Sequence, residues 1–150
     1  MFIGEFMRVI VQRVLNANCK VDGKITGEIQ NGYMLLVGFN VDDKEDNVYQ
    51  MVKKVLNLRI MDDENHVMNK SILDTGGSIL SISQFTLYAD SNNGNRPSYS
   101  NAMKGENAIK LYQLFNEELR KSIKVEEGIF GADMQISLVN DGPVTIILER

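Results

Sequence analysis

Residues 33–39 have the sequence Tyr33-Met34-Leu35-Leu36-Val37-Gly38-Phe39, a continuous apolar run of the length of a β-strand. Such a run is typical of a strand covered on both faces, so we expect it in the core. The pattern changes from residue 43, where apolar side chains recur at helical spacing: Val48, Met51, Val52, Val55 and Leu56. This spacing predicts an amphipathic helix of about four turns.

On the N-terminal side, the β-branched run of residues 8–14 predicts a strand. Residues 19–22 and 24–29 predict a hairpin, because Asp22-Gly23 between them suits the positive φ angles of a tight turn.

On the C-terminal side, serines alternate with large apolar residues over residues 78–88, which predicts a further strand. The Asn- and Gly-rich residues 90–97 predict a loop, and the apolar stripe of residues 104–123 predicts a second helix.

Two last strands are expected at residues 134–139 and 144–148, joined by Asn140-Asp141-Gly142-Pro143. The order of elements fits neither a regular βα alternation nor an all-β sandwich. The expected fold class is therefore α+β, with a mostly antiparallel sheet and two main helices.

Length and composition describe one ordinary globular domain. The chain has 150 residues, of which 43% are hydrophobic and 24% charged, and a chain of this size forms a single core without a disulfide or metal. We expect the domain to span residues 7–150, with residues 1–6 as an N-terminal extension or remnant, because the strand pattern begins just after the second methionine, Met7.

Charge and cysteine content exclude several classes. A net charge of −4 argues against bulk coating of nucleic acid, although a local RNA contact stays open. No apolar run has the length of a membrane span, and the single Cys19 favours a reducing compartment. We expect a cytoplasmic protein with no membrane association.

Common catalytic side chains are scarce. His66 is the only histidine and lies in the acidic stretch of residues 62–66, so a surface role is the better interpretation. Cys19 falls in a strand pattern and is expected to be a small packed residue. No metal-ligand spacing or Gly-rich nucleotide loop is present, so no metal and no cofactor are expected.

Two segments suggest a functional role in addition to a structural one. In Ser83-Gln84-Phe85-Thr86-Leu87, hydroxyls and an amide interrupt an apolar strand. In Asn140-Asp141-Gly142-Pro143-Val144-Thr145, the Gly-Pro step cannot belong to a central ladder, but it can present backbone groups at a fixed orientation and so distinguish a small chiral group. Ordinary strand and turn roles remain the alternative for both segments.

Together these two segments resemble the paired motifs of the D-aminoacyl-tRNA deacylases, the bacterial and eukaryotic type also called D-Tyr-tRNA deacylase. Residues 7–14, 95–99 and 130–134 are similar to further segments of that family. The likeness extends over essentially all of residues 7–150.

The resemblance implies a homodimer with a barrel-like core that hydrolyses the ester of D-aminoacyl-tRNA, and of mischarged glycyl-tRNA, at the tRNA 3′ end. It implies catalytic roles for Ser83, Gln84 and Thr86. It implies a chirality filter at Gly142 and Pro143 that enters the partner subunit's pocket and excludes L-amino acids. Substrate contacts are further implied for Phe85, Phe130 and Met134, and assistance for the terminal 2′-OH of the tRNA.

Without the resemblance, three classes stay open: an RNA-end hydrolase, a non-catalytic domain that binds a small ligand or an RNA end, and a homodimeric interaction module. The lack of a histidine base fits the substrate-assisted hydrolysis that the resemblance implies, because preorganised donors and a positioned water accelerate ester hydrolysis without one.

Overall fold

The structure is a computed structural model and describes residues 6–150. Of the predicted extension, residues 1–5 lie outside the described residues. The next residue, Met7, is fully buried, and its backbone exchanges two hydrogen bonds of 3.0 Å with that of Arg150. The two ends of the described chain therefore meet at the start of the folded domain.

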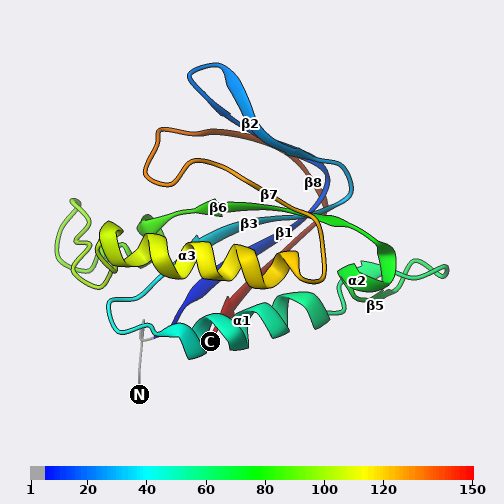
Figure 1. Cartoon of the computed structure of the whole chain (residues 1–150), viewed down its shortest axis with the longest axis horizontal. Helices are drawn as coiled ribbons and strands as arrows, with labels where there is room; N and C mark the ends of the chain where they lie inside the picture. The colour runs from blue at the N-terminus through cyan, green and yellow to red at the C-terminus, as the bar shows by residue number, and fades with distance from the viewer. Residues whose placement is uncertain (1–5) are drawn as a thin grey trace.

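The elements follow in chain order (Figure 1). They are β1 (Arg8–Val21), β2 (Lys24–Ile29), β3 (Gly32–Gly38), α1 (Glu45–Asn57), β4 (Met61–Asp62), β5 (Met68–Lys70), α2 (Ile72–Thr75), β6 (Ser78–Ser83), the 3-10 helix η1 (Phe85–Tyr88), α3 (Gly105–Arg120), β7 (Val125–Glu127) and β8 (Gln135–Glu149). Over residues 6–150, no helix has the length and apolarity to cross a membrane.

The main sheet has the order β2-β1-β3-β6-β7, with β8 on the other side of β1. Its two ends approach each other, because the Thr26 hydroxyl of β2 donates to the Glu127 carbonyl of β7 at 3.2 Å. A nearly closed sheet results. Figure 1 shows α1 and α3 side by side over one face of this sheet.

The α+β class is confirmed, but the sheet is mixed rather than mostly antiparallel. Strand β6 runs parallel to both β3 and β7. The reason is the connection: α1 and α3 each carry the chain back along the sheet before the next strand, and such crossovers join parallel neighbours. The three-residue β7 and the four-residue α2 are too short to give a periodic pattern in the sequence.

Three predicted boundaries are wrong. The strands expected at residues 8–14 and 19–22 form one bent strand, β1, and those expected at 134–139 and 144–148 form one strand, β8. In both long strands the register shifts at β-bulges, and the strand continues through them. The strand expected over residues 78–88 ends at Ser83, and the next residues turn into η1.

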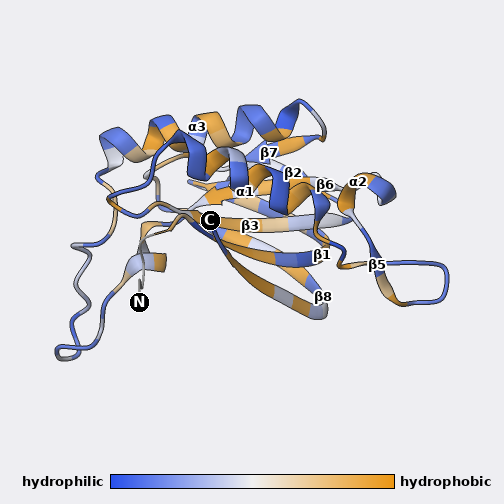
Figure 2. Ribbon diagram, turned by 90° about the horizontal axis from the view of Figure 1, so that it is seen from below, coloured by the Kyte–Doolittle hydropathy of each residue, from blue (hydrophilic) through white to orange (hydrophobic). Residues whose placement is uncertain are grey.

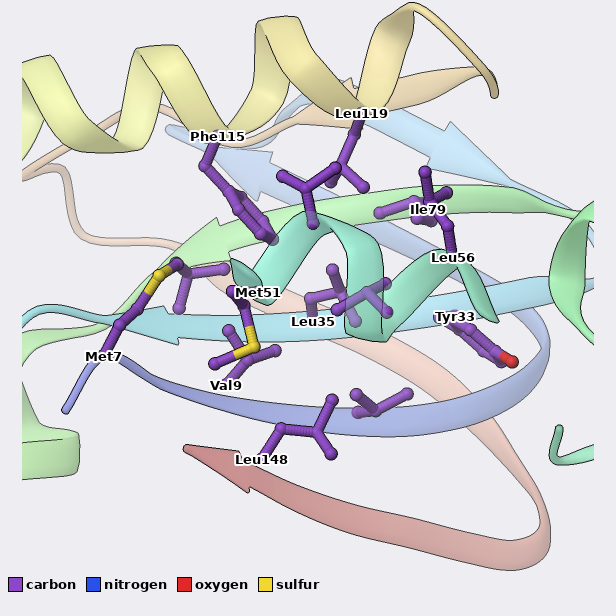
Figure 3. Close-up of a cluster of buried hydrophobic side chains, with 14 of the residues drawn as sticks. Met7, Val9, Tyr33, Leu35, Met51, Leu56, Ile79, Phe115, Leu119 and Leu148 are labelled. Atoms are coloured by element: carbon purple, nitrogen blue, oxygen red, sulfur yellow. The ribbon is translucent and has the colours of Figure 1, made fainter. Parts of the chain in front are cut away.

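The β1–β2 hairpin, the buried strand β3 and the two long helices are confirmed. The turn has positive φ at both Asp22 and Gly23, 50° and 78°. Figure 3 shows Met51 and Leu56 of α1 and Phe115 and Leu119 of α3 pointing to the sheet. Each such side chain contributes roughly 1.5 to 3 kcal/mol on burial, so this helix–sheet layer is the main core.

Asp43 is a buried carboxylate at the loop before α1, and it supports a prediction about pH. It is 6% exposed and accepts a hydrogen bond from the Asn40 amide at 2.6 Å. Burial raises the pKa of Asp43 to about 7, against an ordinary value of 3.8. The folded protein therefore binds this proton more tightly than the unfolded chain, so the free energy of unfolding falls as pH rises between about 4 and 7.

Replacing this carboxyl should remove that loss. We expect the free energy of unfolding of Asp43→Asn, relative to that of the wild type, to be about 1 to 3 kcal/mol higher at pH 8 than at pH 5. Urea unfolding of both proteins at the two pH values measures the gain. A difference between variant and wild type that is the same at pH 5 and pH 8 would contradict the assignment.

Candidate active site

One cavity of about 460 Å³ opens where the parallel strands β3 and β6 end. Its floor comes from Val37 and Gly38 of β3 and from Ser83 and Gln84 at the end of β6. The N-terminus of α3 and residues 99–104 close one side, and residues 130–134 close another. A concave, mostly apolar site with a few polar groups is the usual form of a small-molecule site.

The sequence places Ser83 and Gln84 at this floor through a close backbone approach. The Gln84 amide donates to the Val37 carbonyl at 2.8 Å, which fixes the end of β6 against β3. A Cβ at Gly38 would lie 3.0 Å from the Gln84 carbonyl, so the glycine lets η1 pack onto β3. Within residues 6–150, the side chains of Ser83 and Gln84 form no hydrogen bond to protein and are free for a ligand.

Aromatic side chains stand at the mouth of the cavity. Phe85 is 55% exposed and meets Tyr99 edge to face, with ring centroids 5.0 Å apart. Thr86 follows in η1, is half-buried, and does not line the cavity. The structure thus brings Phe85 to the cavity with Ser83 and Gln84, whereas Thr86 is not among the lining residues.

The opposite wall consists of Phe130 and Met134. The Phe130 ring packs against Tyr112 of α3 at 5.8 Å. Met134 fits because position 128 is glycine: a Cβ there would lie 2.5 Å from the Met134 sulfur. Both residues named by the resemblance for the pocket therefore line the same cavity.

No ordinary acid–base group lines the cavity. Lys104 is the one charged residue among its lining residues, which include no histidine, cysteine or carboxylate within the described chain. His66 is exposed at the turn between β4 and β5, and Cys19 is fully buried, as the sequence predicted for both.

The Gly142-Pro143 segment forms a bulge in the middle of β8. The pairing with β1 jumps from Thr145 to Asn140, so the intervening residues protrude. The Gly142–Pro143 peptide bond is cis, and Gly142 has φ of 116°. The Asn140 side chain closes the bulge by donating to the Arg13 and Val144 carbonyls, both at 3.0 Å.

Arg13 of β1 contacts this bulge through its side chain. Its side chain is buried, and its Nε lies 3.2 Å from Asp141. Its Nη1 donates to the Ile60 carbonyl at 2.8 Å and to Asp62 at 2.9 Å. One guanidinium thus joins the bulge to the segment that follows α1, through charge-assisted contacts.

The bulge and the cavity lie apart in this chain. Arg13 pairs with Tyr33 at the start of β3, whereas the cavity begins at Val37. Four residues of strand correspond to roughly 13 Å, and neither Gly142 nor Pro143 lines the cavity.

Sequence reasoning missed Arg13 and Tyr112. Arg13 lies in an otherwise apolar strand. A charged residue at a strand position that is expected to be buried was the signal available in the sequence. Tyr112 belongs to the apolar stripe of a helix, where nothing in the pattern sets it apart from the other core residues.

A nearly closed mixed sheet with a ligand-sized cavity at its strand ends defines a small α+β protein with a concave candidate binding site at the ends of β3 and β6. The family model described as D-Tyr-tRNA(Tyr) deacylase matches residues 10–149. The chain belongs to the D-Tyr-tRNA(Tyr) deacylase family and is a D-aminoacyl-tRNA deacylase, a hydrolase that acts on tRNA.

Solved structures are similar over the whole chain. One, "c-Myc DNA Unwinding Element Binding Protein", is 40% identical, has a TM-score of 0.90, and is matched over 95% of this chain and 98% of its own. Another is titled "Structural Analysis of a probable eukaryotic D-amino acid tRNA deacylase". It has a TM-score of 0.84 over 96% of this chain and 99% of its own, and at 17% identity it shows the fold alone.

Proposed function

We propose that this protein removes D-amino acids, and glycine attached to the wrong tRNA, from the tRNA 3′ end in the cytoplasm, while it spares L-aminoacyl-tRNA. Ser83, Gln84 and Phe85 hold the ester and the terminal ribose in the cavity, with Phe130 and Met134 against the amino acid. Gly142 and Pro143 act as the chirality filter. The observation that carries this proposal is the set of uncommitted polar side chains at the cavity floor of a deacylase-family fold.

The filter acts between two copies of the chain. Since the bulge lies roughly 13 Å along the sheet from the cavity of its own protomer, a second copy has to supply it. Strand β8 suits such pairing: among residues 6–150 it pairs with β1 alone, and it exposes Val139 and Ile147 by 47% and 64%. Figure 2 shows β8 largely in hydrophobic colours. An unpaired apolar edge strand is a template for another chain.

Hydrolysis proceeds without a side-chain base. The terminal 2′-OH of the tRNA orients or activates a water toward the ester carbonyl, and the cavity excludes other water. Lys104 at the cavity and the exposed Arg96 in the adjoining loop are placed to meet the few phosphates near the RNA end. The DNA binding named for the 40% identical neighbour gains no support from the net charge of −4.

Single-turnover hydrolysis of D-Tyr-tRNA, L-Tyr-tRNA and Gly-tRNA, with and without a chelator, tests the proposal. Loss of the D and glycyl esters with the L ester intact supports it. If the L ester is lost equally fast, the filter is wrong. If all three esters survive, the protein does not hydrolyse these substrates, and a non-catalytic role in binding an RNA end replaces the proposal.

Subunit mixing tests the shared site. The Gln84→Ala homodimer is expected to be inactive, and the Gly142→Ala homodimer to have lost its D-selectivity. In a mixed dimer, the intact cavity of the Gly142→Ala chain meets the intact bulge of the Gln84→Ala chain, so the mixed dimer should hydrolyse D-Tyr-tRNA selectively at up to about half of the wild-type rate. No recovery in a verified mixed dimer would show that filter and cavity belong to one chain.

The absence of Thr86 from the residues that line the cavity supports a prediction about the nucleophile. We expect Thr86→Ala to keep a substantial part of the single-turnover rate, within about tenfold of the wild type, because water and not the threonine attacks the ester. Rapid-quench kinetics with D-Tyr-tRNA measures this. Trapping of an acyl ester on Thr86 of the wild-type protein would reverse the assignment.

A further inference from the structure

Tyr112 lies on the inner face of α3, one turn beyond the cavity residue Ala108, and is 2% exposed. Its hydroxyl donates to the carbonyl of Ser81 in β6 at 2.7 Å. Burial raises the pKa of Tyr112, so the hydroxyl keeps its proton and remains a donor at neutral pH.

Three walls of the cavity meet at this side chain. The helix that carries Tyr112 also contributes Gly105 and Ala108 to the cavity. The acceptor Ser81 is two residues before Ser83, so their side chains project from the same face of β6. The same Ser81 carbonyl accepts the Gly128 amide at 3.3 Å, and the Phe130 ring packs on the Tyr112 ring. One residue therefore contacts the helix wall, the floor strand and the opposite wall.

The surroundings of Tyr112 are unexpectedly polar for a helix–sheet interface. Asn116, one turn further along α3, is 1% exposed and lies close to the Tyr112 hydroxyl. Within residues 6–150, neither the amide of Asn116 nor the Ser81 hydroxyl has a protein partner in hydrogen-bond geometry. Such groups cost about 1 to 3 kcal/mol each when unpaired, so apolar residues of the same size would stabilise this interface better.

We propose that Tyr112, supported by Asn116 and Ser81, is a positioning residue for the hydrolysis: it fixes the strand end that carries Ser83 and Gln84 relative to α3 and to Phe130. The inference rests on the proposed function, because it takes Ser83 and Gln84 as the floor of the active site. Retaining polar groups that lower stability is typical of positions kept for activity.

The test compares Tyr112→Phe with Tyr49→Phe. The first removes the hydroxyl and keeps the ring on Phe130. The second removes a hydroxyl from a half-exposed tyrosine of α1 that lies near Lys121, beyond the far end of α3. We expect Tyr112→Phe to lower kcat about tenfold with KM within about twofold, because the ester still binds but meets a displaced floor. Tyr49→Phe should leave both values unchanged.

Asn116→Leu separates positioning from simple structural support. It replaces two unpaired polar atoms with an apolar side chain, so Tm should stay equal or rise while kcat falls. A fall of Tm and of kcat together, or an unchanged kcat in Tyr112→Phe, would overturn the positioning role. Gln84→Ala serves as reference: if it too keeps the wild-type rate, the proposed floor of the site has failed, and the inference falls with it.

Discussion

Gly142→Ala should abolish D-selective deacylation: the ratio of the single-turnover rates on D-Tyr-tRNA and L-Tyr-tRNA should fall at least a hundredfold, which corresponds to roughly 2.7 kcal/mol of lost discrimination. Gly142 has φ of 116°, which L side chains rarely adopt, and a Cβ would lie 2.7 Å from Val144 Cγ2 and 2.8 Å from the Val144 amide nitrogen. The bulge has to shift to relieve these contacts. A filter that depends on fixed backbone groups does not survive such a shift.

Gly23→Ala is the matched control. Gly23 has φ of 78° in the β1–β2 turn, and a Cβ there would meet no atom within 4 Å. The substitution should cost about 1 kcal/mol of stability through backbone strain and leave the deacylation rate unchanged. Sedimentation should show both variants with the wild-type oligomeric state. Full D-selectivity in a folded Gly142→Ala protein would contradict the filter.

Arg13→Leu should give the second large effect, on stability and activity together. The guanidinium is 7% exposed and contacts Asp62, Asp141 and the Ile60 carbonyl. Losing these contacts frees the Asp141-Gly142 bulge and leaves a buried carbonyl without its donor. We expect the free energy of unfolding to fall by about 2 to 4 kcal/mol and the ratio of the rates on D-Tyr-tRNA and L-Tyr-tRNA to fall more than tenfold under conditions where circular dichroism shows a folded protein.

Lys70→Met provides the comparison for the loss of an ion pair. Lys70 is 3.5 Å from Glu64, with side chains 43% and 77% exposed, on the β4–β5 hairpin. Exposed pairs contribute at most about 1 kcal/mol, so stability should change little and the rate not at all. If Arg13→Leu keeps the wild-type D-selectivity, the bulge does not need its anchor and the role of Arg13 is limited to stability.

The candidate site was only partly accessible to sequence reasoning. The segment 83–87 could be singled out because polar residues interrupt an apolar strand, and segment 140–145 because Gly-Pro interrupts another. The structure brings Ser83, Gln84, Phe85, Phe130 and Met134 to one cavity. Thr86, Gly142 and Pro143 are not among the residues that line it, which a one-dimensional pattern could not show.

Local patterns determined the helices at residues 45–57 and 105–120, the buried strand at 32–38 and the Asp22-Gly23 turn, since periodicity and turn chemistry act over a few residues. Long-range pairing decided the rest. The parallel partners of β6, the short β7, the continuity of β8 and the anchoring of its bulge by Arg13 depend on contacts between segments up to 141 positions apart. Such contacts carry no local pattern, because packing and burial select the partner only when the whole core forms.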